Sequence, residues 1–245
     1  MVWRVEHFAQ VDSTNTWLAE RARGGADEGL VALADYQSSG RGRLGRTWEA
    51  SPGGSLLCSV LLRPDLDPSQ MQLAVAAVAL SLRAAIVRLS GVRPRLKWPN
   101  DLLIEDRKLA GVLAEIVQSE RGRAVVVGFG VNLTSHPTQS AINLREASGV
   151  TIDPRGLLDI VLEEIEPRRA QLESADGRGA LLGEYRGALA TLGRTVSVDM
   201  GERVHVGLAE RVDDAGRLVV RTNGVEMTFD TGDVVHVAMA GGDGA

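Results

Sequence analysis

Cysteine is nearly absent from this chain of 245 residues, in which Cys58 is the only one. A lone cysteine excludes an internal disulfide, and its place in the apolar run 55–62 predicts a small core residue rather than a nucleophile. Histidine is also scarce, because the chain has four histidines and none of them has metal-ligand spacing. We therefore expect no structural metal site.

Long apolar segments and an excess of basic residues are missing as well. We expect no apolar run to approach the roughly 18 residues of a membrane span, and the N-terminus lacks the apolar stretch of a secretory signal. The formal net charge is -5, whereas a protein that coats nucleic acid needs a broad basic face. These absences predict a cytoplasmic protein without a membrane or DNA partner.

The hydrophobic pattern divides the chain into two folded parts. Residues 1–192 mix predicted helices and strands, with an antiparallel meander over residues 95–133. From residue 193 short alternating strands follow, and their number fits a small SH3-like β-barrel over residues 193–240. We expect a disordered tail at residues 241–245. The predicted fold class is α+β, with a mixed, largely antiparallel sheet, packed helices and a small barrel.

Three stretches have the pattern of helices. Polar capping residues precede good helix formers near residue 13, and residues 70–89 are rich in alanine and leucine. Residues 154–192 have helical periodicity, which we expect to be interrupted at Pro167 and at the glycines 177 and 179.

The most distinctive segment is residues 40–48, where three arginines alternate with glycines and a tryptophan follows. Predicted strands at 30–34 and 55–62 bracket a connection of roughly 20 residues, and loops of that length are usually functional. Glycine lets backbone N–H groups approach phosphate while arginine neutralises its charge. The Gly-Arg pattern alone is also consistent with an exposed basic turn or with an RNA-binding segment.

A second group of charges surrounds a predicted hairpin that contains Lys97, Asp101 and Lys108. By itself, Trp-Pro-Asn-Asp is a turn sequence, and a lysine on an edge strand often only discourages sheet pairing. Gly111, inside the next strand, indicates close approach of a ligand or another backbone. With the glycines of 128–132, the chain has three elements suited to phosphate and a polar ligand.

Together these motifs resemble the biotin protein ligases. The family has Gly-Arg-Gly-Arg-x-Gly-Arg, Lys-Trp-Pro-Asn-Asp, Arg-Lys-Leu-Ala-Gly and Gly-x-Gly-x-Asn segments, which occur here in the same order at 40–46, 97–101, 107–111 and 128–132. The segment 12–16 matches as well. The resemblance implies a class II synthetase-like fold and a reaction in which ATP and biotin give biotinyl-5′-AMP, whose biotin then passes to a lysine of a carrier protein.

The resemblance also implies roles for individual residues. Lys108 and Arg43 are the implied catalytic residues, and Mg²⁺ is expected to accompany ATP near Asp101 rather than to occupy a metal site of its own. The implied biotin contacts are Ser13, Thr14, Asn15, Gln37, Gly40, Arg41, Gly42, Arg43, Trp48, Lys108 and Gly111. The implied nucleotide contacts are Arg43, Arg46, Trp48, Lys97, Asn100, Asp101, Lys108 and Asn132.

The implied partner is the biotin carboxyl carrier domain of an acyl-CoA or pyruvate carboxylase. The catalytic motifs begin close to Met1, so we expect a monofunctional ligase without the helix-turn-helix domain of family members that repress transcription. An edge strand of the meander can pair across a two-fold axis, so both a monomer and a weak homodimer are consistent with the sequence.

Three alternatives remain at this point. A lipoate or octanoate transferase of the same superfamily shares the fold and the lysine, but the arginine-glycine loop favours biotin. An RNA-binding protein could use the loop without any turnover of ATP. A biotin-binding protein without catalysis is disfavoured by the presence of Lys108.

Overall fold

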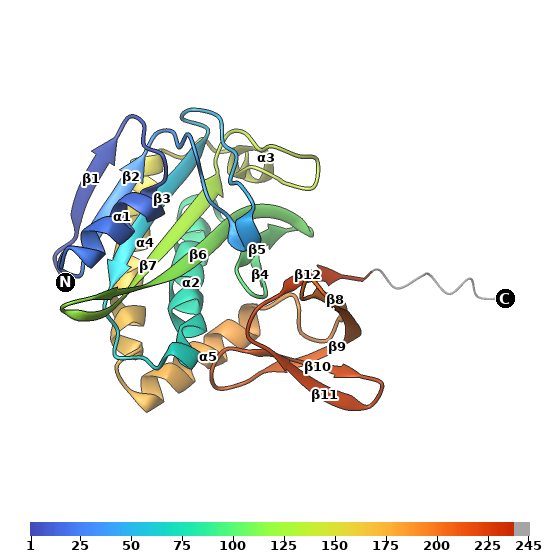
Figure 1. The fold of residues 1–245 in the computed structure, drawn as a ribbon. Coiled ribbons are helices and arrows are strands. Elements are labelled where there is room, and N and C mark those ends of the chain that lie inside the picture. Colours follow the sequence, from blue (N-terminus) through green and yellow to red (C-terminus); the bar gives the residue numbers. More distant parts are fainter. Residues whose placement is uncertain (238–245) are drawn as a thin grey trace.

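The computed structural model describes residues 1–237 and has two β-sheets, the larger of which is covered by helices (Figure 1). The larger sheet has seven strands in the order β1-β2-β3-β7-β6-β5-β4. Only β1 and β2 are parallel neighbours within it. The bounds are β1 Arg4–Phe8, β2 Leu30–Ala34, β3 Ser55–Leu62, β4 Arg95–Lys97, β5 Asp101–Ile104, β6 Arg107–Ser119 and β7 Gly122–Asn132.

The helices divide between the two faces of this sheet. In Figure 1, α1 lies in front of the sheet and α2 and α4 lie behind it. The main core forms on the side of α2, α4 and α5, whereas α1 packs in a smaller cluster with Leu61 and Val126. The bounds are α1 Thr14–Arg23, α2 Gln72–Ser90, α3 Leu144–Ser148, α4 Pro154–Gln171 and α5 Ala175–Ala188, with short 3₁₀ turns at Arg43–Gly45 and Pro68–Gln70.

The helical segment 68–90 is long and apolar enough to cross a membrane by length and composition, and its most apolar 18-residue window has a mean hydropathy of 1.8. The expectation that no segment reaches this length was wrong, because few charged residues interrupt its alanine and leucine. In the structure 67% of its most apolar window is buried, against the sheet and the helices α4 and α5. Burial inside the core accounts for this composition.

The second sheet has five antiparallel strands in the order β11-β10-β9-β8-β12. Within residues 1–237 its outer strands, β11 and β12, do not pair with each other, so the predicted closed barrel is not found. Asn223 and Gly224 have φ of 50° and 83°, as the predicted type I′ hairpin requires. The bounds are β8 Thr195–Asp199, β9 Val204–Val212, β10 Leu218–Thr222, β11 Val225–Phe229 and β12 Asp233–His236.

The predicted break in the last helical region is at the wrong residues. Pro167 lies inside α4, and residues 177 and 179 lie inside α5, so the break is at residues 172–174. Pro167 has no backbone N–H and so leaves one hydrogen bond of α4 unmade. In the preceding turn, the carbonyl of Glu164 accepts hydrogen bonds from the side chains of Ser81 and Arg168. The predicted tail at 241–245 lies outside the described residues.

Candidate active site

A pocket opens on the face of the large sheet that α1 occupies, and its floor is made of glycines. Gly111 of β6 pairs with Gly130 of β7, and a Cβ added at Gly130 would lie 2.5 Å from the Trp48 ring. A Cβ at Gly128 would overlap the Asn15 amide. The indole and the helix therefore contact the sheet directly, because side chains are missing at these positions.

One wall is a buried polar cluster at the N-terminus of α1. Gln37 Oε1 accepts hydrogen bonds from the backbone N and the hydroxyl of Thr14, at 2.7 and 3.0 Å. Ser59 Oγ is within hydrogen-bond distance of both Thr14 Oγ1 and Asn15 Oδ1, at 2.8 and 2.6 Å. Ser13, the N-cap of α1, is also buried. Polar groups buried this completely, at a helix end whose dipole favours polar or negative ligand groups, indicate a binding site.

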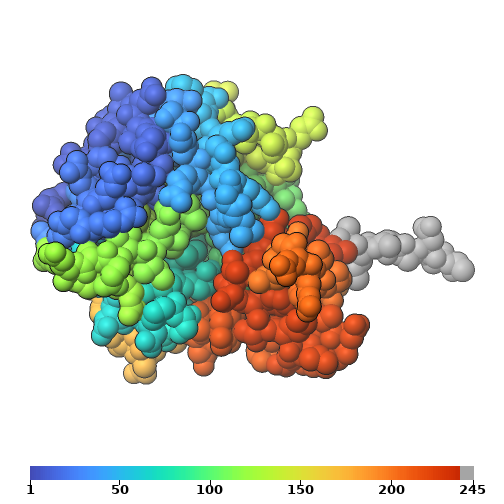
Figure 2. Space-filling view, viewed as in Figure 1, coloured from blue at the N-terminus to red at the C-terminus, as the bar shows by residue number. Residues whose placement is uncertain are grey.

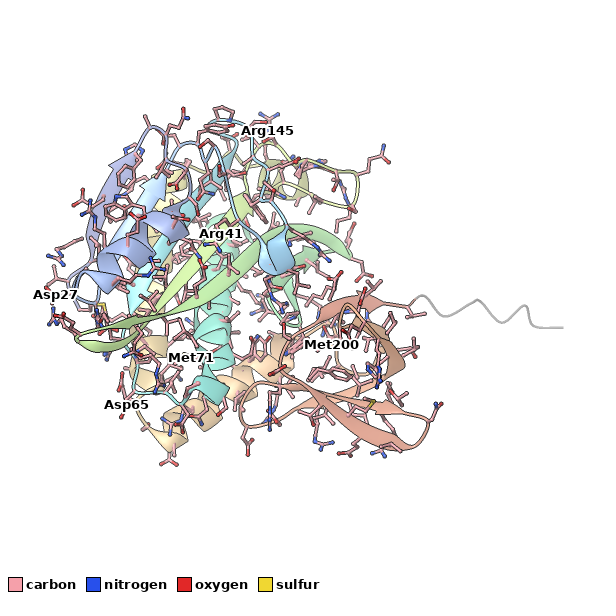
Figure 3. All side chains as sticks on the ribbon, viewed as in Figure 1. Asp27, Arg41, Asp65, Met71, Arg145 and Met200 are labelled. Atoms are coloured by element: carbon pink, nitrogen blue, oxygen red, sulfur yellow. The ribbon has the colours of Figure 1, made fainter. Side chains whose placement is uncertain are left out.

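Glu115 connects this wall to the arginine loop, which we call the lid (residues 40–48). Its carboxylate accepts from Asn15 Nδ2 at 2.8 Å and pairs with Arg41 at 2.8 Å. Figure 3 shows Arg41 over the sheet face that carries α1. The base of the lid is closed where Trp48 N donates to Gly40 O at 3.0 Å.

The opposite wall contains Lys108, which a β-bulge directs into the pocket. Leu103 of β5 is opposite Lys108 and Leu102 is opposite Ala110, so the intervening Leu109 has no partner. One extra residue reverses the side-chain alternation. Lys108 and Gly111 are three positions apart, so in a regular strand they would face opposite sides of the sheet. Because of the bulge, Lys108 Nζ lies 3.3 Å from the position of a Cβ on Gly111.

Lys108 has both an acidic and an aromatic neighbour. Its Nζ is 2.7 Å from Asp101 Oδ1 and 5.5 Å from the centre of the Trp48 ring. Backbone bonds to Ser140 and Ile142 hold the strand at this point, and Asn132 Nδ2 donates to the carbonyl oxygen of Lys108 at 3.4 Å. The main chain of Lys108 is therefore held at both its N–H and its carbonyl group.

The lid reaches the C-terminal sheet through two arginines. Arg43 donates to Thr231 Oγ1 at 2.5 Å, to the Gly232 carbonyl at 3.4 Å and to Asn100 Oδ1 at 3.3 Å. Arg46 pairs with Asp233, the first residue of β12. In Figure 2 the lid, in blue, lies against the red C-terminal sheet.

The electrostatics of the two arginines differ. Burial lowers the pKa of Arg43, and its hydrogen-bond partners are all neutral. The hydrogen bond with Asp233 instead raises the pKa of Arg46, and that of Asp233 is lowered by the same contact. A partly buried cation whose hydrogen-bond partners are all neutral attracts an anionic ligand.

The structure brings most of the predicted residues together. Gly40 lies at the lid base and Asn132 lies behind Lys108, whereas Lys97 lies near Asp233 and His236 at the junction with the second sheet. These three do not line the pocket. The lining includes the predicted residues Ser13, Thr14, Asn15, Gln37, Arg41, Gly42, Arg43, Arg46, Trp48, Asn100, Asp101, Lys108 and Gly111.

Sequence reasoning missed several contributors. Glu115, Gly232 and Asp233 belong to segments that no motif marked, and only strand pairing brings them to the lid. Cys58 is confirmed as a buried residue at the back of the pocket, and burial raises its pKa, which argues against a nucleophilic thiolate. Among residues 1–237, no group of three or more histidine, cysteine or acidic side chains is placed to hold a metal ion.

Comparison with known proteins identifies the family of the chain that forms this pocket. Residues 7–132 match the biotin/lipoate A/B protein ligase family, and residues 191–237 match the biotin protein ligase C-terminal domain. The biotin–[acetyl-CoA-carboxylase] ligase of Mycobacterium tuberculosis is 36% identical, over 96% of this chain and 90% of that protein. The bifunctional ligase/repressor BirA of Escherichia coli is 32% identical, over 91% of this chain and 71% of that protein.

Solved structures agree with this result. A biotin protein ligase from Aquifex aeolicus in complex with biotin and ATP has a TM-score of 0.81 at 26% identity, covering 95% of this chain and 97% of that one. The chain belongs to the biotin/lipoate A/B protein ligase family. Within that family it is a biotin protein ligase, because its C-terminal residues match the domain that bears that enzyme's name.

Proposed function

We propose that this chain activates biotin with ATP to form biotinyl-5′-AMP and transfers the biotin to a lysine of a biotin carboxyl carrier domain. The observation that carries the proposal is the convergence of Lys108 and Arg43 on one pocket beside Trp48. The family match and the relative solved with biotin and ATP support both substrates.

In the first step a carboxylate oxygen of biotin attacks the α-phosphorus of ATP, and pyrophosphate leaves. Negative charge from the carboxylate and the triphosphate meets at the reacting atoms. Lys108 supplies a fixed cation for both groups, and Arg43 supplies another from the lid. Cations fixed before the reaction stabilise the transition state without the cost of reorganising water.

In the second step the neutral amine of the carrier lysine attacks the acyl carbon. An amide bond forms, the bond from the acyl carbon to the phosphate oxygen breaks, AMP leaves, and the amine proton is released to solvent. The lid favours this order of events because it shields the reactive acyl phosphate from water until the lysine arrives.

The other predicted roles remain part of the proposal. The cluster of Ser13, Thr14, Asn15, Gln37 and Arg41 would bind the ureido ring, since it offers both donors and acceptors. Asn132 and Lys97 would act indirectly, from behind Lys108 and from the domain junction. Asp101 fits a Mg²⁺ ion held mainly by ATP phosphates, which typically needs only one or two protein carboxylates, and the ion would neutralise phosphate charge.

We also propose that residues 1–192 form the catalytic domain and residues 193–240 an SH3-like domain. The match of residues 191–237 to a separate C-terminal domain supports this division. The protein would act in the cytoplasm on the carrier domain of an acyl-CoA or pyruvate carboxylase, without DNA or a membrane. Beyond Gly111, β6 has no partner from β5, so a weak homodimer by strand pairing would compete with a monomer.

ATP–pyrophosphate exchange tests the first step without a carrier protein. We expect exchange with biotin and none with lipoate or octanoate at the same concentration. Exchange that depends on lipoate or octanoate would assign the chain to a different branch of the family, and no exchange with any acid would refute the adenylation step.

A further inference from the structure

The outer face of the C-terminal sheet is apolar where it meets solvent. The ladders of β12, β8 and β9 place Val235, Ser197 and Val206 side by side in one row. In the adjacent row, Thr195 lies opposite Leu208 and its carbonyl accepts from Val237 N. Side chains at directly opposed positions share one face of a sheet.

We call this face the valine strip and define it as Val204, Val206, Leu208, Val235 and Val237. Every one of these side chains is at least 40% exposed. The alternate residues Val196, Val198 and Val234 are buried in the core on the other face. Buried and exposed residues thus alternate as in a regular strand, yet the exposed ones are apolar. A contiguous exposed apolar patch is typical of a surface that binds another protein.

The valine strip is continuous with the edge of the active-site pocket. At one end of the strip, Val204 lies in a row with Asp199 and Asp233. Asp233 both lines the pocket and pairs with Arg46 of the lid. Met200 is 41% exposed, and its sulfur is 3.2 Å from the position of a Cβ on Gly232, another pocket residue. Met200 directly follows β8 and is labelled in Figure 3 beside the C-terminal sheet.

We infer that the valine strip binds the carrier domain during the second step. This inference rests on the proposed function, which requires a folded protein to bring one lysine to the acyl carbon. A single side chain has a short reach, so the carrier must bind next to the pocket. The strip meets that requirement, and its apolar centre beside the acidic residues 199 and 233 has the composition of a protein interface.

The test is a double substitution, Val206→Thr with Val235→Thr, which keeps the shape and strand propensity of two exposed residues. The acceptor is the isolated biotin carboxyl carrier domain of an acetyl-CoA carboxylase, at varied concentration. We expect the KM for this domain to rise by about 5- to 10-fold, while kcat and biotin-dependent pyrophosphate exchange stay unchanged. The matched control is Val225→Thr, which removes an exposed valine from β11, at the far edge of the sheet.

Hydroxylamine provides a second acceptor, because it takes biotin from the adenylate without any docking surface. The double variant should react with hydroxylamine as the unsubstituted protein does. An unchanged carrier KM, with exchange intact, would overturn the inference and leave the proposed function standing. A dimer in sedimentation that the double variant abolishes, with KM unchanged, would assign the strip to a second copy. Absence of biotin-dependent exchange in the unsubstituted protein would instead refute the proposed function and the docking inference with it.

Discussion

At the scale of single residues, the chemistry depends on the direction in which Lys108 points. The side chain enters the pocket because Leu109 is an unpaired extra residue in β6, so Lys108 and Gly111 share a face. Asp101 and the Trp48 ring then surround the ammonium group. The residue could be predicted from its motif, but the bulge that directs it could not.

We predict that Lys108→Ala lowers the rate of biotin-dependent pyrophosphate exchange by roughly 10²–10³-fold. A cation aimed at developing negative charge typically contributes ~2.7–4 kcal/mol to the transition state. Lys97→Ala is the matched control. Because Lys97 does not line the pocket, this variant should lose much less exchange activity. An exchange rate near that of the unsubstituted protein would remove Lys108 from the mechanism.

At the scale of elements, β7 and the lid form the site together. The glycines at 128 and 130 were recognised as suited to a ligand, yet their immediate role in the structure is to admit Asn15 and Trp48. That role depends on contacts between the sheet, α1 and the lid, which lie far apart in the sequence.

Substitution of Gly130 by alanine should disturb the lid without unfolding the sheet. The new Cβ would lie 2.5 Å from the Trp48 ring, so the indole must move. Overpacking of this kind typically costs 1–3 kcal/mol, and we expect the KM for biotin to rise by roughly 10- to 100-fold. Gly183→Ala in α5, where a Cβ would meet nothing within 4 Å, is the control. Equal KM values for the two variants would contradict this explanation.

Asp233→Asn should increase the release of free biotinyl-5′-AMP. The substitution keeps the shape of the side chain and removes its charge, which weakens the contact between Arg46 and β12. Arg46 is 61% exposed, and exposed pairs contribute about 0.2–1 kcal/mol, so we expect roughly a 1.5- to 5-fold increase. Released adenylate is measured by chromatography, and biotin on bystander lysines gives a second readout.

Glu226→Gln is the matched control for this prediction, because that residue pairs with arginines on the same sheet, away from the lid. The exchanged pair Arg46→Asp with Asp233→Arg should restore retention in part. If release from Asp233→Asn equals that from Glu226→Gln, the contact does not hold the lid.

At the scale of the whole molecule, the pocket collects residues from Ser13 to Asp233, and the two sheets meet beside it. Trp98 Nε1 donates to the Gly216 carbonyl at 3.0 Å across this junction. His236 lies there too, 3.3 Å from Thr191 Oγ1 and 3.1 Å from Arg194. The junction thus contains a titratable group close to the catalytic hairpin.

We predict that His236 makes the junction sensitive to mild acid. Burial lowers its pKa, the charges of Arg194 and Lys97 lower it further, and Asp106 opposes them in part. Below about pH 6.5, His236 binds a proton more readily in the unfolded chain than in the folded one. The free energy of unfolding therefore falls as the pH falls, and it levels off below the pKa of His236 in the folded protein. Melting temperatures at pH 7.5 and 5.5 should differ less in His236→Gln than in the unsubstituted protein.

The same substitution at His205, elsewhere on the C-terminal sheet, controls for the loss of an imidazole. If His236→Gln leaves the pH dependence of the melting temperature unchanged, another group is responsible for any acid sensitivity.

Physical reasons explain which parts of the fold could be predicted from the sequence and which could not. Strands at 30–34 and 55–62 were predicted at their observed bounds, because they are apolar, buried and bracketed by turns. β1 was missed, since Arg4–Phe8 has only five residues and three of them are exposed. The motifs identified the loop and the hairpin, whereas Asp233 and Glu115 are ordinary residues whose role arises only from the pairing of distant strands.

Gly111 and Gly130, which pair in the floor of the pocket, limit the ways in which the range of accepted acids can be altered. Glycine is already the smallest residue, so every substitution at 111 or 130 makes the pocket shallower. Room for a bulkier acid must therefore come from the lid, where Leu44 lines the pocket and is 63% exposed. Engineering toward larger substrates would begin with the lid, and the floor would serve only to exclude them.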